Sequence, residues 1–479
     1  MVNRKKKIIW IAGAVFLAAV VLIILILLFG GRALKPRIEA AASRALRMDV
    51  RIRGGIRISF LPAFGASLAD LTVKNGEADV ATVADVKIGL RLLPLIIGKV
   101  RISRLELVKS VISIVRQKDG TLNIITRRGK PSGKRVVLKK IAISEGSFLY
   151  TNLRSGGKIE WEGVDITVKD LSAGGTPEGD PLKTLSLTGD IRCGAIKAGN
   201  FMLTDVALRV MGVKGVIDVS HSSKQVFGGT GSGTFRADFT GAEPYFKIIL
   251  AVSRLKIQDL LQESPNAKSM EGLADLSADL AATGKTALAV KRSLSGQVSL
   301  NAENILLNDM DIDDLISSLR RSRRFNLVDV GAFFLAGPLG PVLTRSYRFA
   351  DLVKESQGGK GVIVKLVSVW KVGNGVAVAA DVAMATKERR IAMKGGLNLV
   401  DDRFEDAVVA VLDERGCAVL TQKVHGSFSS PEIGNINVLR SLASPVTNLL
   451  KRALKLFDSG PCDVFYSGSV APPEHKKLP

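Results

Sequence analysis

The sequence predicts a mainly β protein: an N-terminal transmembrane helix followed by a long antiparallel β-sheet with a few helices. Three observations carry this prediction. Residues 8–29 form one uncharged, apolar run. Beyond it, apolar and polar side chains alternate with a period of two, as in strands with one apolar and one wet face. Glycines separate these segments without long helices between them, which favours antiparallel connections because parallel crossovers need a dozen or more residues.

The run at residues 8–29 is long enough to cross a membrane, since a helix of this length spans roughly 33 Å. Basic residues flank it on both sides: Arg4, Lys5, Lys6 and Lys7 before it, and Arg32, Lys35 and Arg37 after it. Only seven residues precede the run, so we expect residues 1–7 in the cytoplasm and the bulk of the chain across the membrane. A cleavable signal peptide is the alternative, but its apolar region would be about 7–15 residues.

The chain is strongly basic, with 68 Lys and Arg against 45 Asp and Glu and a formal net charge of +23. Simple solubility and attraction to anionic lipid headgroups both account for this charge. Nucleic acid is not expected as a partner, because the charges are spread thinly and an exported, anchored domain rarely meets DNA.

Three cysteines are present, Cys193, Cys417 and Cys462. An odd count in an exported protein suggests one pair and one leftover thiol. Cys417 and Cys462, both near the C-terminus, are the favoured pair; three buried free thiols are the alternative.

Beyond the anchor, apolar residues at helical spacing predict a short helix over 35–46. Residues 32–304 then form the first β-rich domain. The clearest alternating segments are 184–191, 234–240, 274–280 and 298–303. About 20 strands fit the exported part.

Residues 305–343 break the alternation and are predicted as a helical, apolar insertion, with helical character over 305–324. A second β-rich domain follows over 344–471, with a helix at 439–456. Residues 472–479 are predicted as a disordered tail.

The search for catalytic chemistry finds no constellation. The sequence lacks a phosphate-binding loop, a nucleophile elbow, a zinc-protease helix and a calcium loop. The glycine run at 228–233 leads into a strand and is interpreted as a hairpin or bulge. The acidic residues at 309–314 are interpreted as a helix N-terminus rather than a calcium site. We therefore expect no catalytic residues, no metal and no cofactor.

Strands with one apolar face must hide that face. They can pack on another sheet, close into a barrel, or curve into a trough that holds an apolar ligand, and composition leaves this choice open. The candidate wall residues of such a trough are Phe235, Phe239, Phe246, Ile248, Leu276 and Leu280.

Several motifs carry a resemblance to a known family, and those toward the C-terminus are the more specific. They are Phe-Leu-Pro at 60–62, Asp-Gly-Thr-Leu-Asn-Ile at 119–124, the segment 226–233, Phe-Leu-Ala-Gly-Pro-Leu-Gly at 334–340, and the segments 416–418, 424–431 and 462–470. On these motifs the chain resembles, over nearly its whole length, the AsmA family of bacterial inner-membrane-anchored envelope proteins.

The resemblance implies a long, curved sheet that forms an open trough of the bridge or chorein-like lipid-transfer type. It implies non-enzymatic transfer of phospholipid between the inner and outer membranes, in support of outer-membrane biogenesis. It also implies a single-pass inner-membrane protein with a periplasmic bulk, a Cys417–Cys462 disulfide, and outer-membrane or periplasmic protein partners. The alternative is an anchored periplasmic scaffold that assists outer-membrane protein assembly and carries no lipid.

Overall fold

The computed structural model describes most of the chain beyond the predicted anchor. The described residues are 35–44, 46–59, 64–90, 102–124, 136–174, 180–199, 201–260, 270–308, 311–318, 327, 359–438 and 462–473. Within these ranges no helix is long and apolar enough to cross a membrane. The predicted anchor at 8–29, its flanking residues Arg4, Lys5, Lys6, Lys7 and Arg32, the predicted helix at 439–456 and most of the predicted tail lie outside them.

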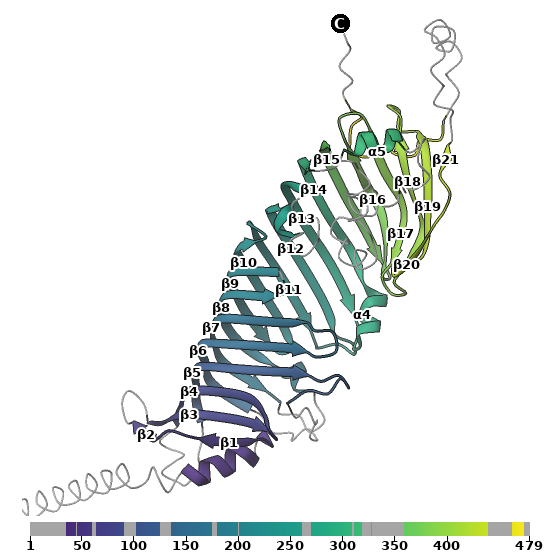
Figure 1. Cartoon of the computed structure of the whole chain (residues 1–479). Helices are drawn as coiled ribbons and strands as arrows, with labels where there is room; N and C mark the ends of the chain where they lie inside the picture. The colour runs from purple at the N-terminus through teal and green to yellow at the C-terminus, as the bar shows by residue number, and fades with distance from the viewer. Residues whose placement is uncertain are drawn as a thin grey trace, which may run out of the picture. The chain divides into compact units, whose positions relative to one another are not determined.

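The protein is mainly β and forms two compact units, residues 1–217 and 218–479 (Figure 1). The strands of unit 1 are β1 (Asp49–Ile52), β2 (Ile56–Ser59), β3 (Gly65–Asn75), β4 (Ala78–Leu90), β5 (Ile102–Arg116), β6 (Val136–Asn152), β7 (Lys158–Ala173), β8 (Ser186–Ala198) and β9 (Phe201–Val213), with the short helix η1 (Pro181–Thr184). From β3 to β9 each strand pairs with the next in sequence.

One pairing in unit 1 is parallel, between β5 and β6. The expectation of antiparallel connections throughout is therefore wrong at this point. The linker from residue 117 to 135 is long enough for the crossover that a parallel pair requires. The glycine and turn residues at its start resemble those of an ordinary hairpin, and for this reason the sequence pattern did not reveal the crossover.

A helix over residues 35–44 confirms the helix predicted after the anchor and protects the edge of β1. The Glu39 carboxylate accepts a hydrogen bond from the Ile52 amide (2.7 Å), and the Ser43 hydroxyl accepts one from Val50 (2.9 Å). Four helical residues rise about 6 Å and two strand residues about 6.6 Å. Helix positions four apart therefore match alternate strand residues, and the helix satisfies backbone groups that an edge strand leaves open.

Unit 2 begins within β10 (Val216–Val226). Its other strands are β11 (Gly229–Asp238), β12 (Tyr245–Lys256), β13 (Met270–Thr283), β14 (Ser295–Asn308), β15 (Lys360–Gly373), β16 (Val376–Ala385), β17 (Arg390–Asn398), β18 (Arg403–Leu412), β19 (Ala418–Ser427), β20 (Ser430–Ile433) and β21 (Asn437–Val438). The helices are α3 (Ile257–Leu260), α4 (Ala287–Ser293) and α5 (Ile312–Ser318). From β11 to β19 successive strands pair antiparallel, and β20 and β21 both pair with β19.

The helical insertion predicted from residue 305 begins too early. Ile305 to Asn308 complete β14, and helix α5 starts only at Ile312. Ile305 and Leu307 are both buried, as alternate residues of a strand are. The same spacing of apolar residues also fits a helix, so a short apolar run could not separate the two.

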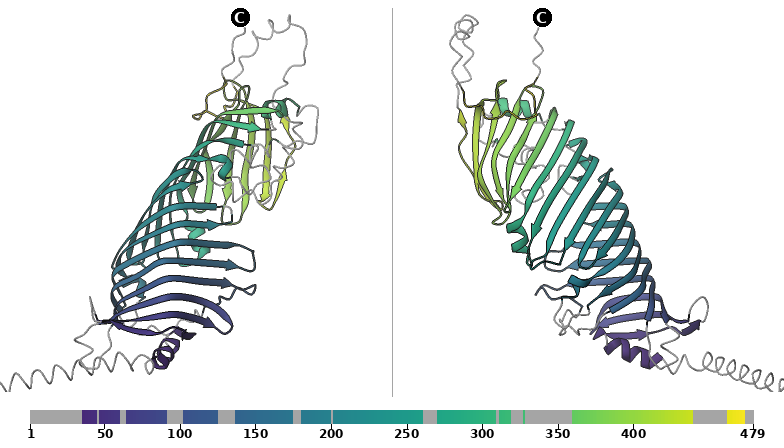
Figure 2. Two further views of the ribbon diagram at one scale, coloured as in Figure 1. Left: turned by 60° about the vertical axis from the view of Figure 1, so that its left-hand side comes forward. Right: turned by 180° about the vertical axis from the view of Figure 1, so that it is seen from behind.

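A line of β-bulges crosses unit 1 from β3 to β9. The line passes through one position on each strand: Asp70, Ala84, Lys109, Glu145, Gly163, Gly194 and Asp205. At five of them the backbone enters the left-handed region, and the other two, Ala84 and Gly194, lie opposite these residues and are left out of the cross-strand pairing. A bulge bends its strand and adds one residue, which shifts the alternation by one position. Figure 2 shows the strands of this unit bending along their length. The line is called the crease below.

Candidate functional site

One face of unit 1 is lined by apolar side chains on both sides of the crease. Cross-strand partners on this face lie directly opposite one another and form continuous rows. One row is Leu68, Val86, Leu107, Ile143, Ile166, Ile191 and Leu208; the other, beyond the crease, is Ala81, Ile112, Phe148, Trp161, Ile196 and Leu203. In β5 to β9 the members of both rows are half-buried.

Burial on this face is greatest beside the crease. The row that borders it consists of Val83, Ser110, Gly146, Val164, Cys193 and Val206, all buried. Val164, for example, is 0% exposed, whereas Ile166 and Trp161 on either side of it are half-buried. A sheet that bends toward its apolar face covers the side chains at the bend with their own neighbours. The gradient therefore indicates that the strands bend toward the apolar side.

In unit 2 the six predicted wall residues lie on one face of β11 to β13 and the turn after β11. Phe235, Ile248 and Leu280 are direct cross-strand neighbours. Phe235 is 38% exposed and Ile248 39% exposed, and the side chains of Phe239, Phe246, Leu276 and Leu280 are half-buried. The structure thus brings these residues together on a partly open surface, and their contact with a ligand stays a prediction.

Three of these residues form an aromatic group at the end of the face. The rings of Phe235 and Phe246 stack with centroids 6.3 Å apart, and Phe239 meets Phe246 edge to face at 6.1 Å. Rings at these separations and angles attract one another. The group is held by β11, β12 and the turn after β11, and it presents apolar surface.

The opposite face of both units carries cross-strand ion pairs. Lys87 pairs with Glu106 at 3.2 Å, and Arg209 pairs with Asp190 at 3.5 Å; in each pair the residues lie directly opposite on neighbouring strands. Lys365 and Glu303 repeat the arrangement in unit 2 at 3.4 Å. These ion pairs keep the outer face solvated. The apolar face has no such charged pairs among the residues named above.

Strands β15 to β18 differ because a stretch of each strand, around Val367, Ala383, Ala392 and Ala410, is buried on both faces. Met384 and Ile391 on the apolar face are 0% exposed, and so are Ala383 and Ala392 on the opposite face. The opposite face is covered by residues 462–473, called the C-terminal strap. Tyr466 and Val470 of the strap pack against a cluster of small and branched residues: Val367, Ala383, Ala385, Ala392, Ala410 and Leu412.

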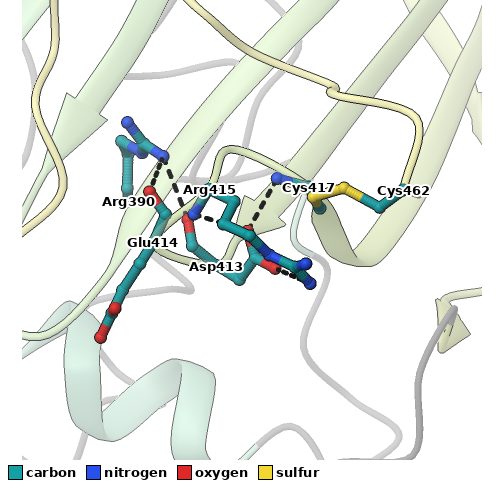
Figure 3. The surroundings of a disulfide bond; sticks show 6 residues. All are labelled: Arg390, Asp413, Glu414, Arg415, Cys417 and Cys462. Carbon is teal, nitrogen blue, oxygen red and sulfur yellow. Dashed lines mark hydrogen bonds and ion pairs between the residues drawn. A yellow bond between two sulfur atoms is a disulfide. The ribbon is translucent and has the colours of Figure 1, made fainter. Parts of the chain in front are cut away.

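A disulfide between Cys417 and Cys462 fastens the start of the strap, which confirms the predicted pair (Figure 3). The Asp413 carboxylate accepts a hydrogen bond from the Cys417 amide at 2.8 Å and holds this turn. Gly416 lies at φ +86°, and a Cβ there would clash with the Tyr466 carbonyl oxygen. The strap therefore approaches the turn so closely that only glycine fits.

Polar contacts fix the rest of the strap. The Tyr466 hydroxyl donates to the Asp381 carboxylate, which also accepts from the Ser469 amide at 3.1 Å. Burial, together with this hydrogen bond, raises the pKa of Tyr466 to about 12. The buried Arg390 guanidinium donates to the Val470 carbonyl at 3.1 Å and to the Asp413 carbonyl at 3.0 Å (the latter in Figure 3). The strap is thus built into the fold of β16 to β19.

The third cysteine, Cys193, is free and buried beside the crease. Burial raises the pKa of its thiol, which makes it a poor nucleophile. In the part of the chain that the structure describes, no three His, Cys, Asp or Glu side chains are grouped as metal ligands.

Comparison with known families gives a match to the AsmA family over residues 1–135 and 180–334. These ranges cover more than half of the chain. The chain belongs to the AsmA family. No curated protein and no solved structure matches it. The match ends at residue 334, so most of the more specific C-terminal motifs lie outside it.

The AsmA family is associated with the bacterial envelope, and this agrees with the expected setting of the chain. Of the basic residues predicted to flank the membrane, Lys35 and Arg37 are described and lie in the helix over 35–44. The Lys35 ammonium donates to the Gly54 carbonyl at 3.4 Å, so it also contributes to the cap on β1.

Sequence reasoning missed the apolar face of unit 1 in this AsmA-family protein. In β6, Ile141 and Ile143 face the apolar side before the bulge, and Phe148 and Tyr150 face it afterwards. A strict period of two places the second pair on the wrong face. A change of phase within one apolar strand, at a polar residue such as Glu145, is the signal that could have revealed both the bend and the face.

Proposed function

We propose that this protein binds the acyl chains of phospholipids on its apolar face and passes them between the inner and outer membranes without catalysing a reaction. The observation that carries the proposal is the half-buried apolar surface of β5 to β9 and of β11 to β13. Membership of an envelope-associated family supports it. A periplasmic location of both units, behind an N-terminal anchor, completes the proposal.

The energetics favour such a face. Each CH₂ group that leaves water for an apolar surface gains about 0.8 kcal/mol. Aliphatic side chains bind an acyl chain through apolar contact alone, whereas the headgroup stays in water at the open side. Rows such as Ile112, Phe148 and Trp161 place one apolar side chain on each strand, about 4.8 Å apart. An acyl chain that moves along such a row exchanges one contact for the next.

The test compares two neighbouring residues on opposite faces of β12. Ile248 is 39% exposed on the apolar face, and Ile249 is 43% exposed on the outer face. The full-length chain is purified in detergent, and the phospholipid that remains bound is extracted and measured by mass spectrometry. We expect Ile248→Glu to reduce the bound lipid about tenfold or more, because a carboxylate beside an acyl chain would lose its hydration.

Ile249→Glu is the matched control and should retain the wild-type amount of lipid. A second pair in β5 repeats the comparison in unit 1, with Ile112→Glu on the apolar face and Val111→Glu on the outer face. If the wild-type chain carries no lipid, or if both members of each pair behave alike, the proposal is wrong. The scaffold alternative requires that outcome, since a scaffold without cargo has no reason to distinguish the two faces.

A further inference from the structure

Three cations on the outer face of unit 1 break the pattern of paired charges. Arg104 in β5 lies directly opposite Lys140 in β6, and Lys140 lies directly opposite Lys169 in β7. Like charges directly opposite one another destabilise a sheet. Elsewhere on this face a cation such as Lys87 or Arg209 has a carboxylate as its cross-strand neighbour.

The surrounding carboxylates do not neutralise these three residues. The acidic residues nearby are Asp170, next to Lys169 in sequence, Glu106, two residues along from Arg104, and Asp190, diagonal to Lys169. Among the described residues Asp170 forms no ion pair with the three cations. Glu106 already pairs with Lys87 and Asp190 with Arg209. Among the described residues, Arg104, Lys140 and Lys169 have neither an ion pair nor a side-chain hydrogen bond.

We propose that Arg104, Lys140 and Lys169, together called the cationic strip, dock the outer face of unit 1 onto the anionic headgroups of a phospholipid bilayer. The three side chains span about 10 Å across three strands. Arg104 and Lys169 are exposed, and Lys140 is half-buried. The strip is an open line of long cations without a concave site, which suits a charged surface better than a small soluble anion.

The position of the strip in the sheet favours a bilayer as the partner. Arg104 lies two residues after the start of β5, and Lys169 lies four residues before the end of β7. The start of β5 and the end of β7 lie on the same side of the sheet as the end of β4, where the strands terminate. The sequence between β4 and β5 contains Leu-Leu-Pro-Leu-Ile-Ile at 92–97, a composition suited to an apolar interface rather than to water.

The strip does not require that the apolar face carries lipid. A basic side chain near an anionic membrane surface strengthens binding about fivefold, so three of them strengthen it about a hundredfold at low salt. The attraction weakens as salt shortens the Debye length. The strip would thus hold unit 1 against a membrane and select anionic headgroups, whereas the apolar face would handle acyl chains.

The experiment uses the full-length chain in phosphatidylcholine nanodiscs and measures its co-flotation with added vesicles. One set of vesicles contains phosphatidylglycerol and phosphatidylethanolamine, and the other contains phosphatidylcholine alone. We expect binding to the anionic set only, with a loss of about a hundredfold in the triple variant Arg104→Gln, Lys140→Gln and Lys169→Gln.

The matched control is the triple variant Lys87→Gln, Lys197→Gln and Lys247→Gln, which removes three positive charges from lysines that have carboxylate partners. It should lose far less binding. Equal losses in the two triple variants, unchanged binding of the strip variant, or equal binding of wild type to both vesicle sets would overturn the proposal. If the wild-type chain binds inorganic polyphosphate, the strip variant does not, and neither binds anionic vesicles, the strip would be assigned to a soluble polyanion instead.

Lipid extracted from the same strip variant separates this proposal from the proposed function. We expect the strip variant to retain the wild-type amount of co-purified phospholipid. Wild-type flotation without co-purified lipid would contradict only the lipid-carrying face, and retained lipid with unchanged flotation would contradict only the strip.

Discussion

Within unit 2, strands β11 to β13 and strands β15 to β18 put the same antiparallel pattern to different uses. In β11 to β13 the apolar face is partly open and the outer face carries charges such as Lys247 and Asp279. In β15 to β18 a stretch of each strand is buried on both faces, and the strap covers the outer one. Small residues, among them Ala383, Ala392 and Ala410, leave room for the strap to lie close to the sheet. The strap thus accounts for the burial of the outer face in this region.

The same substitution in each region gives the largest expected contrast. Phe404 in β18 is 1% exposed and packs edge to face on Phe428 at 5.0 Å, whereas Phe235 in β11 is 38% exposed. Phe404→Ala should lower the free energy of unfolding of unit 2 by about 3–5 kcal/mol, because it leaves a cavity. Phe235→Ala should cost about 1 kcal/mol or less, because much of that ring is already in contact with solvent. Urea unfolding of the full-length chain in detergent, followed by the fluorescence of the buried Trp370, measures both, and equal costs would mean that the two regions are packed alike.

The disulfide should stabilise the closed region and leave the open one unchanged. Its half-cystines are 45 residues apart, and a cross-link of that length contributes about 2–4 kcal/mol. Cys462→Ser should therefore accelerate amide hydrogen exchange in β16 to β19. Exchange in β11 to β13 and the amount of bound lipid should stay at wild-type levels. Faster exchange in β11 to β13 as well would show that the strap supports both regions.

The outer faces themselves can be compared with one alanine from each region. Ala410 in β18 is 0% exposed beneath the strap, and Ala251 in β12 is exposed on the outer face. Ala410→Leu should cost about 1–3 kcal/mol through overpacking, whereas Ala251→Leu should change stability by about 0.5 kcal/mol or less. A well-tolerated leucine at position 410 would contradict close contact with the strap.

The smallest expected effect concerns the ionisation of Tyr466. Its pKa is raised to about 12 by burial and by the hydrogen bond to Asp381, against an ordinary value of about 10. The neutral hydroxyl is the favoured form, so the stabilisation is complete below pH of about 10 and is lost as the pH rises through about 12. An ultraviolet titration of the four tyrosines should show one that ionises near pH 12, and Tyr466→Phe should remove that step. An unchanged high-pH step in the variant would leave the strap contact unsupported.

Much of the open region could be predicted from the sequence, because its alternation is regular. The alternation in segments 234–240, 274–280 and 298–303 predicts strands, which the structure confirms. The six wall residues, which come from the first two segments and from β12, share one face. The closed region has its own signal, near-continuous apolar runs such as Val376–Ala385, which are typical of strands buried on both faces. From the sequence, these runs predict strands but not the burial of both faces. The strap that covers the outer face lies about 80 residues further along the chain, so no local pattern connects the two.

The crease escaped prediction for a different reason. A bulge is specified by one residue, such as Lys109 or Glu145, whose left-handed conformation is unusual for a side chain with a Cβ. The bulges of neighbouring strands lie side by side. The position of each bend therefore depends on the strands next to it, which the sequence of a single strand does not contain. The parallel pair of β5 and β6 is likewise decided by a crossover whose residues resemble a turn.

The central claim is that acyl chains lie on the apolar face of the open strands, and adjacent residues of β11 test it most directly. Phe235 faces the apolar side, and Arg236 faces the outer side, where it pairs with Asp218 at 3.2 Å. The photoreactive residue p-benzoylphenylalanine is placed at one position or the other in the full-length chain in cells, and lipid adducts are measured by mass spectrometry after irradiation. We predict a phospholipid adduct at position 235 and none at 236. No adduct at 235, or equal adducts at both positions, would contradict the account.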